Sequence, residues 1–184
     1  MNKVGKLLIA NPTMPEGHFF SKSVVYIYAD NDTQGTVGIV LNKKSTTTVQ
    51  AICHDNLAIY NDTSNMIHVG GPVNRQAIVM LHTNDWTSQN TTVAGNGLNI
   101  SSDQLMFLKL AEGNEPAWWR MCMGMSVWAP GQLDMEIKGQ FPYHTAHQWL
   151  TAEPNEDIIF GYDGEEQWNK ALELCSHQII NQWF

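Results

Sequence analysis

The apolar positions of the first half of the chain follow the pattern of short β-strands. Runs rich in Val, Ile and Leu alternate with segments that contain Asn, Asp, Gly and Pro, which are typical of turns. The expected strands cover residues 7–10, 23–29, 36–41, 67–69 and 77–82. The second and third of these flank a polar turn and predict a β-hairpin, in which Gly38 indicates a bulge or a close backbone approach.

Helical periodicity prevails later in the chain. The expected helices cover residues 47–55, 104–111, 132–138 and 164–183, and Ser101–Asp103 supplies the start signal of the second helix. Residues 93–100 predict a loop or a twisted hairpin, and residues 119–128 predict a buried strand. Because hairpins come first and helices follow, the pattern favours an α+β fold over a doubly wound parallel sheet. The chain shows no repeat and no linker, so we expect one domain over residues 1–184.

The composition excludes several classes of protein. Hydrophobic residues make up 43% of the 184 positions and charged residues 15%, which is too apolar for a disordered chain. The formal charge is 10 − 18 = −8, and the basic residues do not cluster, so direct nucleic-acid binding is disfavoured. No apolar run reaches the length of a membrane span or of a signal-peptide core, which predicts a cytoplasmic protein without a membrane partner.

The cysteines and tryptophans indicate structural roles. Cys53, Cys122 and Cys175 are odd in number and far apart in the sequence, so we expect reduced, buried thiols. Seven tryptophans are many for this length, and positions such as Trp119, Trp128 and Trp168 fit the core.

Several short motifs, in order, resemble the YqgE/AlgH family of bacterial proteins. They are Gly5–Met14, Ser23–Tyr26, Gly35–Asn42, Gly70–Val73, Leu81–His82, Gly131–Leu133 with Glu136, Trp149–Leu150, and Phe160 followed by Trp168 and Ala171. The resemblance implies an α+β fold in which a bifurcated, largely antiparallel sheet folds into a pseudo-barrel flanked by helices. It implies no agreed set of catalytic residues, because the family is usually labelled uncharacterised, with a tag of transcriptional regulator.

The chain also departs from the family pattern. Ala29-Asp30 stands where Glu-His is common, Ala77-Ile78 replaces an Arg-Gly pair, and Gly124–Trp128 replaces a Gly-Tyr-Ala-Gly-Trp block. Residues 140–148 form an additional stretch before Trp149. A family chemistry that used that His or Arg would therefore be absent from this chain.

The turn Gly70-Gly71-Pro72-Val73 is the strongest local signal. Two glycines permit a close backbone approach or positive φ, so the turn is either an amide nest for an anion or a structural turn at a strand end, and the structural role is favoured. Gly124–Trp128 contains half of a nucleophile elbow, but Trp128 occupies the position of its second glycine, which excludes a hydrolase motif. His68 and His82 have no partner that the sequence identifies.

Two pairs of side chains have a spacing that could indicate a metal site or an acid–base pair. His144 and His147 lie three residues apart without the glutamate of the metalloprotease motif, so we expect no physiological metal there. Asp134 and Glu136 lie on different sides of the predicted helix, which makes Glu136 a cap or a hydrogen-bond acceptor for a neighbouring loop.

These observations favour a non-enzymatic domain that binds an unknown small molecule or protein, without a cofactor, as a monomer or weak homodimer. The candidate ligand-binding residues are Asn42, Gly70, Gly71, Pro72, His82, Trp128, Gly131 and Gln132. One alternative is a transcriptional regulator that acts directly or through a protein partner. Because the chain is acidic and has no basic stripe, action through a protein partner is favoured. The other is a hydrolase-like enzyme built around Asp30, His82, Ser126 or Cys122.

Overall fold

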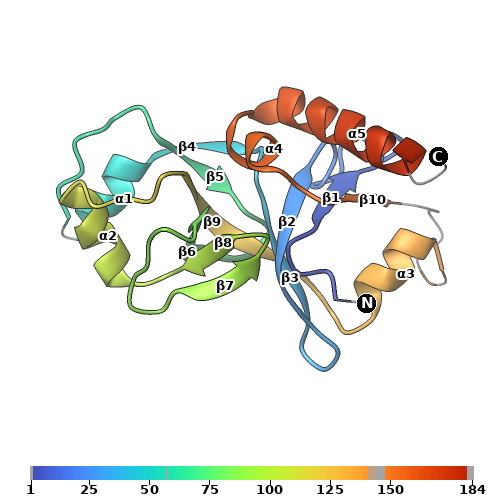
Figure 1. Cartoon of the computed structure of the whole chain (residues 1–184), viewed down its shortest axis with the longest axis horizontal. Coiled ribbons are helices and arrows are strands. Elements are labelled where there is room, and N and C mark those ends of the chain that lie inside the picture. The colour runs from blue at the N-terminus through green and yellow to red at the C-terminus, as the bar shows by residue number, and fades with distance from the viewer. Residues whose placement is uncertain (1, 57, 141, 143–147, 182–184) are drawn as a thin grey trace.

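The computed structural model describes residues 2–56, 58–140, 142 and 148–181. Within these residues, ten strands form one sheet with the main order β10-β1-β2-β3-β9-β6-β8-β7, and five helices accompany it (Figure 1). The strands are β1 (Leu7–Ala10), β2 (Val24–Asn31), β3 (Gly35–Val40), β4 (Lys44–Thr48), β5 (Met66–Val69), β6 (Val73–Thr83), β7 (Thr92–Gly95), β8 (Leu98–Ser101), β9 (Trp119–Trp128) and β10 (Trp149–Ala152). The helices are α1 (Val49–Asp55), α2 (Gln104–Ala111), α3 (Gln132–Lys138), α4 (Glu156–Phe160) and α5 (Gly164–Asn181).

The sheet forks along β9. The C-terminal end of this strand pairs with β3, from Ser126 to Trp128, whereas Cys122 and Met123 pair with β5 on the same side. The other side of β9 pairs with β6 over most of its length. Among the described strands, the β5–β9 pair alone is parallel, so the sheet is largely antiparallel and curls into a half-barrel. The predicted α+β class with a bifurcated sheet is therefore confirmed.

Glycines make the fork possible. Gly70 donates its N–H to the Met123 carbonyl at 2.8 Å, and its own carbonyl accepts from Val40. A Cβ atom added to Gly71 would lie 2.1 Å from the Met125 carbonyl, so only glycine permits this approach of two backbones. The connection from β5 to β6 thus packs directly against the backbones of β3 and β9, where the sheet forks.

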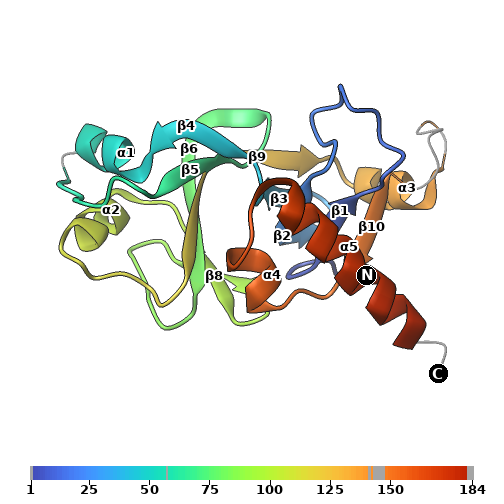
Figure 2. The ribbon, with the colours of Figure 1, turned by 90° about the horizontal axis from the view of Figure 1, so that it is seen from above.

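The helices cover different parts of the curled sheet. Figures 1 and 2 show α1 and α2 at one end and α3 and α5 at the other. Helices α1 and α2 bury Cys53 and Phe107 in a cluster with Ile67 and Met121, whereas α5 buries Trp168 and other residues against β1 and β2. A third cluster, which includes Leu133 of α3, fills the space beside β10. None of the described helices combines the length and the apolar character needed to cross a membrane.

Most predicted elements are confirmed, some with the predicted boundaries. Strand β9 and helices α2 and α3 have the expected residues, and Asp103 caps α2 by accepting from Met106 N–H. The region 93–100 is a twisted hairpin, formed by β7 and β8. Gly38 lies beside a register shift and in close contact with the Tyr26 carbonyl, as expected. The three cysteines are free and buried.

The pattern missed three elements. The pattern predicts a helix from residue 47 and no element over residues 44–46, but Lys44–Thr48 is a strand. Thr48 is the N-cap of α1. The short strand β10 pairs with β1, and the five-residue helix α4 precedes α5. His144 and His147, which were considered for a metal site, lie outside the described residues.

Candidate functional site

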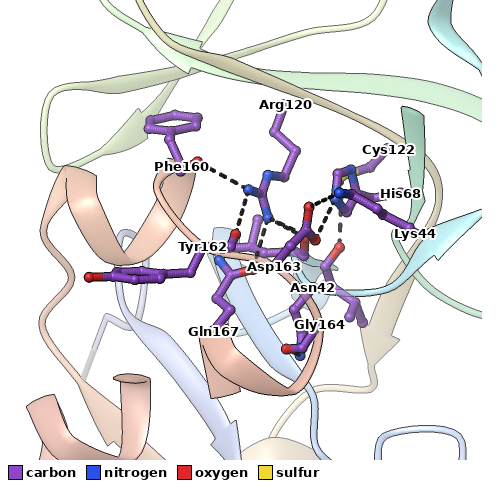
Figure 3. Close-up of polar contacts among 12 residues, drawn as sticks. Asn42, Lys44, His68, Arg120, Cys122, Phe160, Tyr162, Asp163, Gly164 and Gln167 are labelled. Atoms are coloured by element: carbon purple, nitrogen blue, oxygen red, sulfur yellow. Dashed lines mark hydrogen bonds and ion pairs between the residues drawn. The ribbon is translucent and has the colours of Figure 1, made fainter. Parts of the chain in front are cut away.

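A buried arginine lies at the centre of a polar cluster where β5, β9 and the connection between α4 and α5 meet (Figure 3). Arg120 stands on β9, which is otherwise rich in apolar residues, and only 7% of its surface is exposed. The neighbouring strand β5 contributes His68, and Asp163 comes from the residues between the two helices. Asp163 Oδ1 lies 2.9 Å from His68 Nε2 and 4.0 Å from Arg120.

The guanidinium of Arg120 connects segments that are far apart in sequence. One of its nitrogens donates to the Leu41 carbonyl and, at 2.9 Å, to Gln167 Oε1. The other donates to the carbonyls of Tyr162 at 2.9 Å and Phe160 at 3.4 Å. Burial lowers the pKa of Arg120, while the charge of Asp163 opposes this shift. The side chain therefore holds the α4–α5 connection against the sheet.

Asp163 is held as a carboxylate. Partial burial favours its protonated form, but hydrogen bonds from His68 and Lys44, together with the charge of Arg120, outweigh this effect and keep its pKa well below the usual range. Lys44 Nζ lies 2.8 Å from Asp163 Oδ2. Burial lowers the pKa of His68, and its hydrogen bond to Asp163 only partly opposes that shift. His68 is thus neutral at pH 7, and its buried Nδ1 has no hydrogen-bond partner within the described structure.

A polar cavity of about 210 Å³ opens beside this cluster. Lys44, half exposed on β4, lies at its wall with His68, Arg120 and Asp163, and Ser64 and Asn65 complete the polar lining. With His68 neutral, these ionisable groups carry a charge of 2 − 1 = +1, in a chain whose formal charge is −8. The cavity is thus a local basic site on an acidic protein.

The cluster lacks an activated nucleophile. Cys122 is the register partner of His68 across the β5–β9 pair, but burial raises its pKa to about 12 and its thiol lies 3.8 Å from the Val40 carbonyl. A protonated, buried thiol does not attack a carbonyl carbon or a phosphorus centre. Ser126 donates its hydroxyl to the Gly70 carbonyl at 3.1 Å, and within the described residues it makes no hydrogen bond to an imidazole. A histidine beside a carboxylate is present, but without a nucleophile it does not form a catalytic triad.

The residues proposed for an enzyme also lie apart. Asp30 accepts from Thr36 and from the Lys3 amide, whereas His82 contacts the Thr83 carbonyl and Ser101 Oγ. Within the described structure, no hydrogen bond joins two of the four residues Asp30, His82, Ser126 and Cys122.

Of the predicted ligand-binding residues, Asn42 makes a hydrogen bond to the backbone next to Asp163. Its amide oxygen accepts from Val24 N–H, and its amide nitrogen donates to the carbonyls of Lys22 and Gly164, each at 2.8 Å. Gly164 follows Asp163 directly, so Asn42 helps to fix the backbone that positions this carboxylate.

The other predicted residues fall at three separate places. Gly70 and Gly71 are buried at the sheet fork, with Pro72 exposed beyond them. His82 is buried on β6. Trp128, Gly131 and Gln132 belong to the junction of β9 and α3. The structure therefore does not bring the Gly-Gly-Pro turn and the Gly131–Leu133 segment together around one of the described cavities.

Sequence reasoning did not single out Lys44, Arg120 or Asp163. One signal was available: Arg120 is a single cation in the apolar segment 119–128, and a buried strand admits a charge only with a partner. That partner could not be identified, because Asp163 lies 43 positions further along the chain and no local pattern connects the two residues.

Comparison with known proteins gives the family. The model of the AlgH-like family matches residues 7–180. A UPF0301 protein of Hydrogenovibrio crunogenus is 31% identical over an alignment that covers 90% of this chain and 85% of the relative. A UPF0301 protein of Gluconobacter oxydans is 28% identical, and its alignment covers 91% of this chain and 88% of the relative. The solution structure of the AlgH protein from Pseudomonas aeruginosa is similar with a TM-score of 0.74, at 27% identity over 92% of this chain and 87% of that one. A crystal structure from Corynebacterium diphtheriae, at 22% identity over 91% of this chain and 84% of that one, shares the fold with a TM-score of 0.70. The chain belongs to the AlgH-like family.

Proposed function

We propose that the chain is a non-enzymatic binding domain that takes a small anionic ligand in the cavity between β4, β5, β9 and the α4–α5 connection. The observation that carries the proposal is the position of Lys44 on the cavity wall. The Lys44 side chain is half exposed, whereas the Asp163 carboxylate that its ammonium group contacts also accepts from His68. The ammonium group thus retains donor capacity toward the cavity.

The charge of the cavity supports an anion as the ligand. Its ionisable groups sum to +1 although the chain is acidic overall, so the local field attracts an anion that the rest of the surface repels. The Ser64 hydroxyl and the Asn65 amide nitrogen already donate to Asp62 and Tyr60, so these two side chains offer a ligand only their oxygen atoms as acceptors.

The size of the cavity supports a small ligand. At about 210 Å³ it is below the usual range of drug-sized sites, which begins at roughly 300 Å³. A carboxylate or phosphate group on a small metabolite fits this volume, whereas a dinucleotide does not. The protonated, buried thiol of Cys122 and the hydrogen bond from Ser126 to the Gly70 carbonyl support binding without covalent chemistry at these two residues.

The test is a titration of the full chain with succinate and with inorganic phosphate at constant ionic strength. Binding is followed by calorimetry and by the rise in melting temperature. We expect one site for at least one of the two anions, and Lys44→Ala should weaken its affinity about tenfold, as expected for a lost charged hydrogen bond.

Lys170→Ala is the matched control, because Lys170 also contacts a single carboxylate, that of Glu173, but on the exposed face of α5. This variant should bind the anion like the wild type. Failure of both anions to bind, or equal affinity in the wild type and Lys44→Ala, would overturn the proposal.

A further inference from the structure

A second cavity, of about 310 Å³, lies beside Phe160. It is lined by Trp118, by Glu156 and Asp157 of α4, and by Phe160 and Gly161. Phe160 is the residue that it shares with the anion cavity. The second cavity has a different chemistry, because it combines two aromatic rings with two carboxylates and includes no cation.

Trp118 differs from the other tryptophans that the structure describes. The indole N–H groups of Trp86, Trp119, Trp128, Trp149 and Trp168 each donate to an oxygen of the protein. Among these described residues, Trp118 alone has an indole N–H without a protein acceptor, and 55% of its surface is exposed. A large aromatic ring that is neither buried nor hydrogen-bonded is unusual for a residue that stabilises a core.

The carboxylates of the cavity are also unpartnered. Glu156 and Asp157 form the first turn of α4 and are exposed, and within the described chain neither makes an ion pair. The wall around Trp118 is acidic as well, since the Asp85 carboxylate accepts from Ala117 N–H. A cation in this cavity would meet negative charge and aromatic faces at the same time.

We propose that this cavity receives an arginine side chain of a protein partner. A guanidinium group stacks on indole and benzene rings, and its N–H groups match carboxylates. Trp and Arg are also the residues that contribute most to protein interfaces, which suits an open site with an exposed tryptophan. The proposal does not depend on the anion cavity, since the two sites share only Phe160.

The experiment uses the isotope-labelled full chain and follows the indole N–H resonance of Trp118 by NMR. That resonance is assigned through its loss in Trp118→Phe. The probe is Nα-acetyl-arginine methylamide, and the control probe is the citrulline analogue, which has nearly the same shape without the charge. We expect a saturable shift with the arginine probe and binding weaker by about fivefold with citrulline, as for the loss of a cation–π contact and its ion pair.

Substitutions then test the carboxylates. The double variant Glu156→Gln/Asp157→Asn should weaken binding of the arginine probe about threefold or more. Glu165→Gln/Glu166→Gln is the matched control, because it removes two carboxylates from the first turn of α5, outside the cavity, and should bind like the wild type. The remaining indole resonances report whether each variant is folded.

Three results would overturn the proposal. One is a linear shift that does not saturate, and another is an equal response to arginine and citrulline. The third is saturation by choline at lower concentration than by the arginine probe, because it would identify a cage for a small quaternary ammonium compound instead of a protein side chain.

Discussion

Trp128 and Trp149 donate their indole N–H groups to the same atom, Oε2 of Glu136, at 3.0 and 2.9 Å. The other oxygen of this carboxylate accepts from Gln132 at 2.8 Å. The three elements that meet here are β9, β10 and α3, and Glu136 is buried among them. One carboxylate thus satisfies two buried donors and ties α3 to both strands.

Replacement of Glu136 should therefore destabilise the fold. Glu136→Leu leaves two indole N–H groups buried without an acceptor, and we expect a loss of roughly 3 kcal/mol in the free energy of unfolding. Glu136→Gln keeps one acceptor oxygen and should lose about 1–2 kcal/mol. Urea unfolding measures both values. Lys138→Gln, an exposed change on the same helix, is the control, and a Glu136→Leu variant no less stable than this control would contradict the assignment.

This cluster shows what the sequence predicted and what it did not. The sequence predicts that Glu136 is a cap or a hydrogen-bond acceptor for a neighbouring loop. It is an acceptor, but its donors are two tryptophan side chains from β9 and β10 and Gln132 of its own helix. Trp128 was expected in the core and is buried. Helix α3 followed from local periodicity, whereas β10 did not, because a four-residue strand takes its position from pairing with β1, far away in sequence.

The missed elements share a physical cause. Residues 44–48 are a lysine, a serine and three threonines, so they show no alternation of apolar and polar positions, and only pairing with β5 makes them a strand. Helix α4 has five residues, fewer than two turns, and its hydrophobic pattern is too short to detect. The polar cluster around Arg120 was missed for the same reason, since its members meet only in the folded chain.

Arg120 should be among the most costly residues to replace. Arg120→Met removes the donors of four acceptors and leaves Asp163 with less compensating charge, so we expect a loss of roughly 3–5 kcal/mol in stability. Arg75→Met is the matched control, because Arg75 is exposed on β6, and it should change stability by less than about 0.5 kcal/mol. Equal urea midpoints for the two variants would contradict the role of Arg120 as a connector.

The stability of the protein should fall as His68 becomes protonated. Burial lowers the pKa of His68 below its ordinary value of 6.5, so the unfolded chain binds this proton more readily than the folded chain. The contribution is complete above pH 6.5 and is lost as the pH falls from there toward the pKa of the folded state. Asp163, whose pKa is depressed, acts in a more acidic window, below its ordinary value of 3.8.

His68→Gln separates the two effects. We expect the free energy of unfolding of this variant to change less between pH 7 and pH 5 than that of the wild type, as measured by urea unfolding at several pH values. Because the Gln amide retains an N–H that can donate to Asp163 in place of His68 Nε2, the stability of the variant at pH 7 should stay within about 1 kcal/mol of the wild type. Parallel pH profiles of the two proteins would show that His68 does not titrate differently on folding.

Gly71 tests the two interpretations of the Gly-Gly-Pro turn. It has no positive φ, so its requirement for glycine comes from contact alone: an added Cβ would lie 2.1 Å from the backbone of Met125. Gly71→Ala should therefore force the fork of the sheet apart and lose at least about 2 kcal/mol. Gly17→Ala, where nothing lies within 4 Å, should stay within about 0.5 kcal/mol of the wild type. A Gly71→Ala variant as stable as Gly17→Ala would contradict the structural interpretation of the turn, which rests on this close approach of two backbones.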